Sequence, residues 1–92
     1  MSSYAAVTST LKNLAQKLGE TQAKVDHEST ETSTVFRFES DQYLVEVIVH
    51  ASGGLNYLLA DVTTGEFLKE GSLSYADGGL WGPTVRDLLA GF

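Results

Sequence analysis

Apolar residues near the start of the chain recur with a helical period. Steps of three and four residues separate Tyr4, Val7, Leu11, Leu14 and Leu18. This spacing places them on one stripe of an α-helix, so the pattern predicts a helix over residues 3–18 that packs on a sheet. Ser2 or Ser3 can cap its start, and Gly19 suits the left-handed turn that ends many helices.

From residue 22 onward the period changes to two, which is typical of β-strands. The alternating segments are residues 22–29, 33–39, 43–51, 55–62 and 66–75. Short polar or glycine-containing turns separate them, and the last turn, residues 63–65, is a hairpin signal with a left-handed Gly65. Short connections between consecutive strands predict an antiparallel meander.

The alternation also predicts which residues share a face of the sheet. If Glu39 faces Gln42 and Ala51 faces Leu55, then Phe36 lies opposite Val45 and Val47 lies opposite Leu59. One face then holds the large apolar residues Phe36, Phe38, Val45 and Val47. The other face carries Arg37, Glu39, Glu46, His50 and Asn56, but also Val35, Leu44, Ile48, Leu58, Ala60 and Val62.

That second face is too apolar to be left in water, because a solvated sheet face is mostly polar. Three elements could pack against this face: the C-terminal helix, a second copy of the chain, or another protein. The sequence leaves these alternatives open.

The C-terminal segment predicts a short helix. Residues 76–79 end the sheet, Pro83 suits the first turn, and helical spacing relates Val85, Leu88, Leu89 and Phe92. The expected fold class is therefore α+β: an N-terminal helix, a five-stranded antiparallel meander sheet and a short C-terminal helix. We expect residues 1–92 to form a single domain.

Composition limits the classes of partner. Twelve Asp and Glu stand against six Lys and Arg, which gives a net charge of −6. Such a chain should repel nucleic acid and anionic membranes and should favour basic proteins. The absence of cysteine excludes disulfides and sulfur-ligated zinc. Because the N-terminal residues lack a signal-peptide pattern, we expect a cytoplasmic protein.

Candidate chemistry is sparse. The two histidines are His27 and His50. Ser52 and Asp61 are the only partners suggested for His50, and they lie in the adjoining turn and at the far end of the next strand, without a nucleophile-elbow motif. Residues 77–79 lack the alternating carboxylates of a calcium loop. We therefore predict no catalytic residue, no metal site and no cofactor.

The excess negative charge is concentrated in one part of the chain. Between residues 26 and 46, only Arg37 offsets six acids: Asp26, Glu28, Glu31, Glu39, Asp41 and Glu46. Tyr75 and Trp81 flank a glycine-rich segment and are candidate aromatic anchors, with Trp81 alternatively closing the core. These eight residues form the predicted partner-binding site.

In size, charge and expected architecture, the chain resembles the small acidic immunity proteins and antitoxins that bacteria encode beside toxins. This resemblance implies a non-enzymatic inhibitor, monomeric or homodimeric, whose acids dock in the basic cleft of a toxin, with Asp61 or Asp77 as further carboxylates. Two other functions remain open. A phage-encoded nucleic-acid mimic would space its acids along one edge, and an acidic dimeric secretion chaperone would expose apolar grooves.

Overall fold

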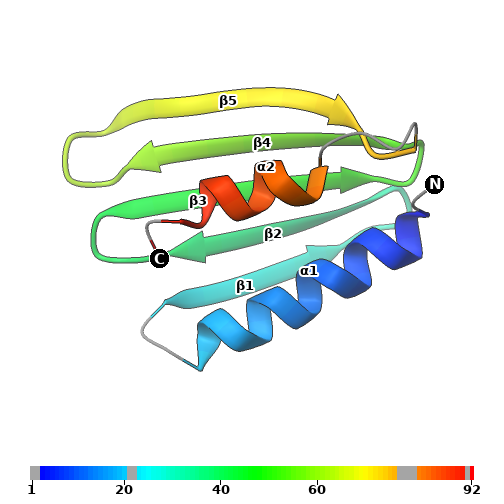
Figure 1. Cartoon of the computed structure of the whole chain (residues 1–92), viewed down its shortest axis with the longest axis horizontal. Coiled ribbons are helices and arrows are strands. Elements are labelled where there is room, and N and C mark those ends of the chain that lie inside the picture. The colour runs from blue at the N-terminus through cyan, green and yellow to red at the C-terminus, as the bar shows by residue number, and fades with distance from the viewer. Residues whose placement is uncertain (1–2, 21–22, 77–80, 91) are drawn as a thin grey trace.

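The chain folds into one five-stranded sheet with two helices (Figure 1). The computed structural model describes residues 3–20, 23–76, 81–90 and 92. In chain order its elements are α1 (Tyr4–Gly19), β1 (Lys24–Ser29), β2 (Ser33–Glu39), β3 (Tyr43–His50), β4 (Gly54–Asp61), β5 (Glu66–Ser74) and α2 (Trp81–Leu88). The strands are antiparallel and neighbours in chain order. The predicted α+β fold class is confirmed.

Two of the predicted local signals are confirmed and one is wrong. Ser3 caps α1, because its Oγ accepts a hydrogen bond from the Ala6 N–H at 3.1 Å. Gly65 has the predicted left-handed conformation, with φ of 77°. Gly19, by contrast, belongs to the helix, and the chain leaves it through Glu20 with a right-handed φ of −75°. The backbone N–H of Glu20 closes the last helical turn instead.

Both predicted strand registers are wrong by two residues. Phe36 lies opposite Val47, and Val47 in turn lies opposite Tyr57. The turns explain the shift: the Ser40 N–H donates to the Tyr43 carbonyl at 2.8 Å, and the Gly53 N–H donates to the His50 carbonyl at 3.1 Å. Because the shift is an even number, every residue keeps its predicted face.

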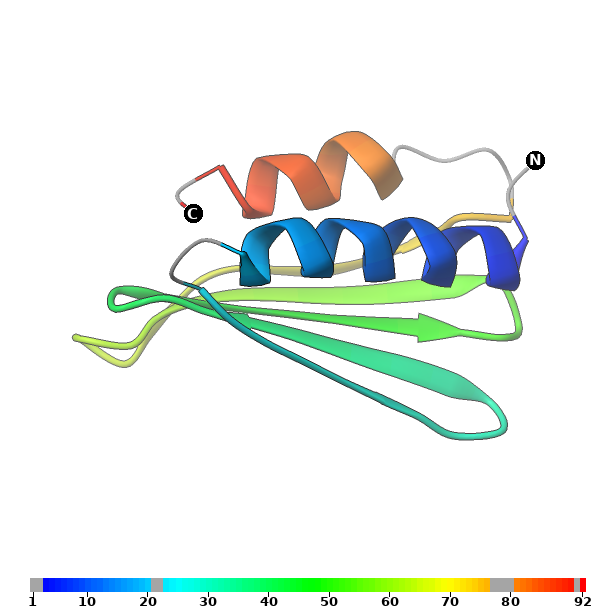
Figure 2. The same cartoon turned by 90° about the horizontal axis from the view of Figure 1, so that it is seen from below.

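Both helices cover the same face of the sheet (Figure 2). Helix α1 contacts β1, β2 and β3, whereas Leu88 of α2 lines a shallow pocket with Tyr43 of β3 and Leu59 of β4. The core lies between these layers and includes Val7, Leu11, Phe36, Phe38, Val45, Val47, Leu55, Val85 and Leu88. The alternative in which the C-terminal helix covers the second sheet face is therefore wrong.

Candidate functional site

The sheet face opposite the helices, here called the open face, carries three cross-strand rows of side chains. Each row takes one residue from each strand, from β1 to β5. The rows are Glu28, Val35, Ile48, Asn56 and Ser72; Asp26, Arg37, Glu46, Leu58 and Glu70; and Lys24, Glu39, Leu44, Ala60 and Phe67.

An apolar strip crosses these rows diagonally. Its members are Val35, Ile48, Leu58, Leu44, Ala60 and Phe67. Neighbours in the strip are either directly opposite or diagonal on adjacent strands, which is within reach of large side chains. No described element covers the strip, and Phe67 is 70% exposed, more than any other large apolar residue in the described ranges. Ala60 is buried by its neighbours, and the other four members of the strip are half-buried. Apolar surface that is left uncovered in this way can mark an interaction site.

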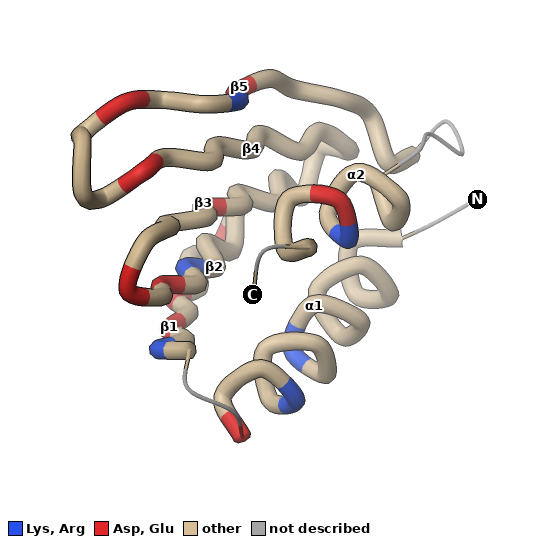
Figure 3. The backbone as a smooth tube through the Cα atoms, turned by 60° about the vertical axis from the view of Figure 1, so that its left-hand side comes forward, with Lys and Arg blue, Asp and Glu red and all other residues tan. Residues whose placement is uncertain are grey.

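Acidic side chains border the apolar strip. The open face holds five carboxylates, those of Asp26, Glu28, Glu39, Glu46 and Glu70, against two cations, Lys24 and Arg37. Figure 3 shows acidic positions along β1 to β3 and their turns and on β4 and β5, whereas the two helices carry both basic and acidic positions.

Arg37 is already neutralised within the face. Its Nε lies 3.2 Å from Glu46 Oε2, and its guanidinium also approaches Asp26 Oδ2 at 3.9 Å. The corrected register creates this arrangement, because it places Arg37 directly between those two acids. Glu28, Glu39 and Glu70 have no ion-pair partner among the described residues, so their charge is available to a partner.

The structure brings together only part of the predicted site. Four of the predicted acids, Asp26, Glu28, Glu39 and Glu46, lie on the open face. The other two do not join them: Glu31 lies in the turn before β2 and Asp41 in the turn after it, so they occupy opposite ends of the strand.

Tyr75 is a core residue rather than an exposed anchor. It is 1% exposed, and its hydroxyl donates a hydrogen bond to the His50 carbonyl. Burial also raises the pKa of its phenol above the ordinary value of 10.0. A side chain buried in this position cannot contact a partner, so Tyr75 is not part of the binding face.

Trp81 belongs to the helical layer. It begins α2 and lines a groove between the two helices, together with Leu11 and Val85. It therefore lies on the opposite side of the sheet from the open-face acids of the predicted partner-binding site.

Phe67 is the residue that sequence reasoning missed. A bulge between Leu59 and Ala60 shifts the pairing of β5, so that Phe67 lies opposite Ala60 on the open face. Strict alternation does not reveal such a bulge, and the register of this strand could not be predicted.

The further candidate carboxylates do not extend the face. Asp61 Oδ1 accepts hydrogen bonds from the Thr63 N–H at 2.9 Å, the Thr63 hydroxyl at 2.6 Å and the Thr64 N–H at 3.3 Å. These hydrogen bonds, chiefly the two from Thr63, lower the pKa of Asp61. The carboxylate therefore stabilises the turn between β4 and β5. Asp77 lies outside the described residues.

The histidines lie on opposite faces of the sheet. His27 stacks on Phe36 on the helix-covered face, with ring centroids 5.9 Å apart, whereas His50 is on the same side of β3 as Ile48. Within the described ranges, no three His, Asp or Glu side chains gather where they could hold a metal ion. None of the described helices is long and apolar enough to span a membrane.

Comparisons with models of protein families, with curated proteins and with solved structures find no significant match to this chain. Function is therefore inferred from the geometry and charge of the chain itself.

Proposed function

We propose that this chain is a protein-binding domain whose open sheet face binds a basic partner. The observation that carries the proposal is the apolar strip, which both helices leave uncovered and which acids without ion-pair partners border. Burial of apolar surface gains about 25 cal/mol per Å². The acidic side chains would favour a partner with a positively charged surface and would increase the rate of association with it.

Charge favours a different protein over a second copy of the chain. A two-fold dimer through the open face would set the same patch against itself. Five carboxylates and two cations on each copy leave three negative charges in excess on both sides. A partner with Lys and Arg around an apolar centre complements both features.

The inhibitor of a basic-cleft enzyme is the most specific form of this proposal. Such an inhibitor needs a rigid surface that combines carboxylates with apolar side chains. The hydrogen-bonded strands of the open face provide a surface of this kind. Mimicry of nucleic acid is less well supported, because the acids alternate with apolar side chains across a face instead of following an edge at phosphate-like intervals.

A matched pair of charge reversals tests the proposal. An affinity-tagged form of the chain is used to capture its partner from the producing cells, and the captured protein is then purified. Glu39→Lys on the open face should slow association with it about fivefold or more at low salt and flatten the salt dependence. Glu20→Lys changes the net charge equally but lies at the end of α1, and it should leave the rate unchanged.

Three outcomes contradict the proposal. The two reversals could have equal effects, Glu39→Lys could leave both rate and salt dependence intact, or the chain could capture no protein at all. Circular dichroism on both variants establishes that any loss of binding is not a loss of folding.

A further inference from the structure

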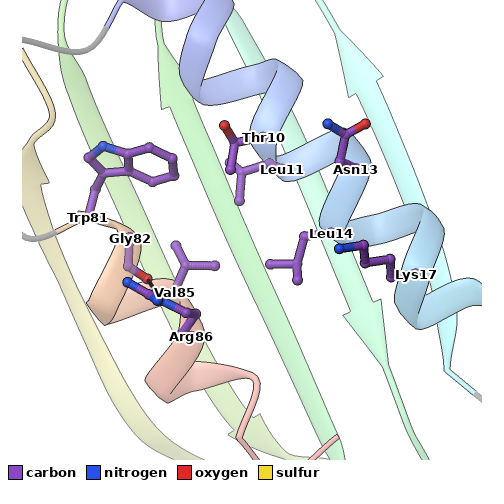
Figure 4. Close-up of a pocket in the computed structure, with 9 residues that line it drawn as sticks. All are labelled: Thr10, Leu11, Asn13, Leu14, Lys17, Trp81, Gly82, Val85 and Arg86. Atoms are coloured by element: carbon purple, nitrogen blue, oxygen red, sulfur yellow. Dashed lines mark hydrogen bonds between the residues drawn. The ribbon is translucent and has the colours of Figure 1, made fainter.

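A groove between the two helices forms a second surface feature, on the side away from the open face (Figure 4). Its volume is about 510 Å³. Leu11 of α1 and Val85 of α2 are buried at its base, and the partly exposed Leu14 and Trp81 form its walls. These four residues give the groove an apolar and aromatic part, and Thr10 and Asn13 of α1 add polar side chains to its lining.

Two cations lie on opposite walls of this groove. Lys17 comes from the last turn of α1, and Arg86 comes from the last turn of α2. The Arg86 Nε donates to the Gly82 carbonyl at 3.4 Å, which leaves its terminal nitrogens for other contacts. Figure 4 places Trp81 toward one end of the groove and Lys17 toward the other.

The charge of the groove is opposite to that of the chain as a whole. The described residues that line it include no Asp or Glu, although the net charge of the chain is −6. Elsewhere Arg37 pairs with Glu46, and Lys69 pairs with Asp87. Lys17 and Arg86 have no carboxylate partner in the described part of the chain.

We propose that this groove binds a small amphipathic carboxylate. The apolar body of the ligand would lie against Leu14 and Trp81, and its carboxylate would bind Lys17 at the other end of the groove through a charge-assisted hydrogen bond. Arg86, on the opposite wall, would add positive charge to the site. A volume of about 510 Å³ lies within the range of small-molecule sites.

The length of the groove favours a small molecule over a peptide helix. Helix α2 has eight residues and is thus about 12 Å long. A docked peptide helix is typically held by anchors over two or more turns of a longer groove. The ligand class is therefore a carboxylic acid with one aliphatic chain or aryl ring.

Fluorescence of Trp81 provides the test, because it is the only tryptophan in the chain. Octanoate is the probe, and octanol and octylammonium are its neutral and cationic counterparts. Octanoate should produce a saturable change in emission. Octanol should bind at least tenfold more weakly, and octylammonium should bind more weakly still.

Substitution of the two cations completes the test. Lys17→Gln combined with Arg86→Gln should weaken octanoate binding at least tenfold and leave octanol binding unchanged. Lys12→Gln removes a charge from an exposed position of the same helix outside the groove, and it should have no effect. Thermal unfolding of each variant provides the folding control.

The proposal is overturned if octanoate and octanol bind equally well, if the double variant binds octanoate normally, or if octanoate produces no saturable change. Preference for a Glu-rich amphipathic peptide over octanoate would also overturn it, since the groove would then bind a macromolecule.

Discussion

At Gly71 the lack of a side chain makes room for an aromatic ring. A Cβ at this position would lie 2.6 Å from the Tyr57 hydroxyl oxygen and 2.8 Å from its Cζ. Tyr57 is directly opposite Gly71 in the pairing of β4 with β5. The constraint at Gly71 is one of space, set by the end of the Tyr57 side chain, because the φ of Gly71 is not positive.

Gly71→Ala should therefore lower the free energy of unfolding by about 1–3 kcal/mol, as the Tyr57 ring has to move off the edge strand. Urea denaturation measures the change. In a Tyr57→Ala background the same substitution should cost little, which a double-mutant cycle would reveal.

Gly19→Ala is the matched control for this prediction. A Cβ at Gly19 meets nothing within 4 Å, and the residue is helical, so alanine should stabilise the chain by about 0.5–1 kcal/mol. Equal effects of the two alanine substitutions would contradict the steric account of Gly71.

The buried phenol of Tyr75 should make the folded chain less stable at alkaline pH. Burial raises the pKa of its phenol in the folded state above the ordinary value of 10.0. The folded chain thus holds this proton more tightly, so the stabilisation is complete below the unfolded pKa of about 10 and is lost as pH rises through the folded pKa. Tyr75→Phe should make the unfolding free energy fall less steeply above about pH 10. Parallel pH profiles for the two proteins would exclude this role.

At the scale of elements, the sequence predicts faces better than it predicts register. Alternation assigns Phe36 and Val47 to the same face in both registers, because pairing Phe36 with Val45 or with Val47 differs by an even number of residues. The hydrogen bonds of the turns, such as that from Ser40 to Tyr43, fix the register, and hydrophobic pattern carries no information about them. The bulge that reorients Phe67 escapes prediction for the same reason.

The turn between β4 and β5 should respond to acid through Asp61. Hydrogen bonds from Thr63, side chain first and backbone second, lower the pKa of the Asp61 carboxyl below 3.8. Its contribution is therefore present above the unfolded pKa and is lost as pH falls through the folded pKa. Asp61→Asn should flatten the fall in thermal midpoint below about pH 4. An unchanged acid profile would show that Asp61 does not contribute.

At the scale of the whole molecule, the fold separates two kinds of surface. The open face combines acids with an apolar strip, whereas the helices carry Lys12, Lys17 and Arg86 against Asp87, which pairs with Lys69. Sequence reasoning located the acidic region and assigned Val35 and Ile48 to the face opposite the core. It could not decide which sheet face α2 covers, because an apolar stripe on a short helix suits either face.

Phe67 should contribute to binding without contributing to folding. Since its side chain is 70% exposed, Phe67→Ser should change the unfolding free energy by less than about 0.5 kcal/mol. It should weaken binding of the captured basic partner about tenfold, or roughly 1.4 kcal/mol, as measured by titration calorimetry.

Leu68→Ser is the matched control for Phe67→Ser. Leu68 is also exposed, but it lines a pocket with Asp87 and Leu88 on the helical side. Its substitution should leave partner binding unchanged. If Leu68→Ser weakened binding and Phe67→Ser did not, the partner would be bound on the helical side.

Position-specific photo-cross-linking in the producing cells tests the central claim most directly. A photoreactive phenylalanine analogue is placed at Asn56, an exposed position on the open face, or at Gln16, an exposed position on α1. We predict that the analogue at Asn56 cross-links to a basic protein and that the analogue at Gln16 does not cross-link to that protein. Cross-linking from Gln16 alone, or from Asn56 only to a second copy of this chain, would contradict the claim.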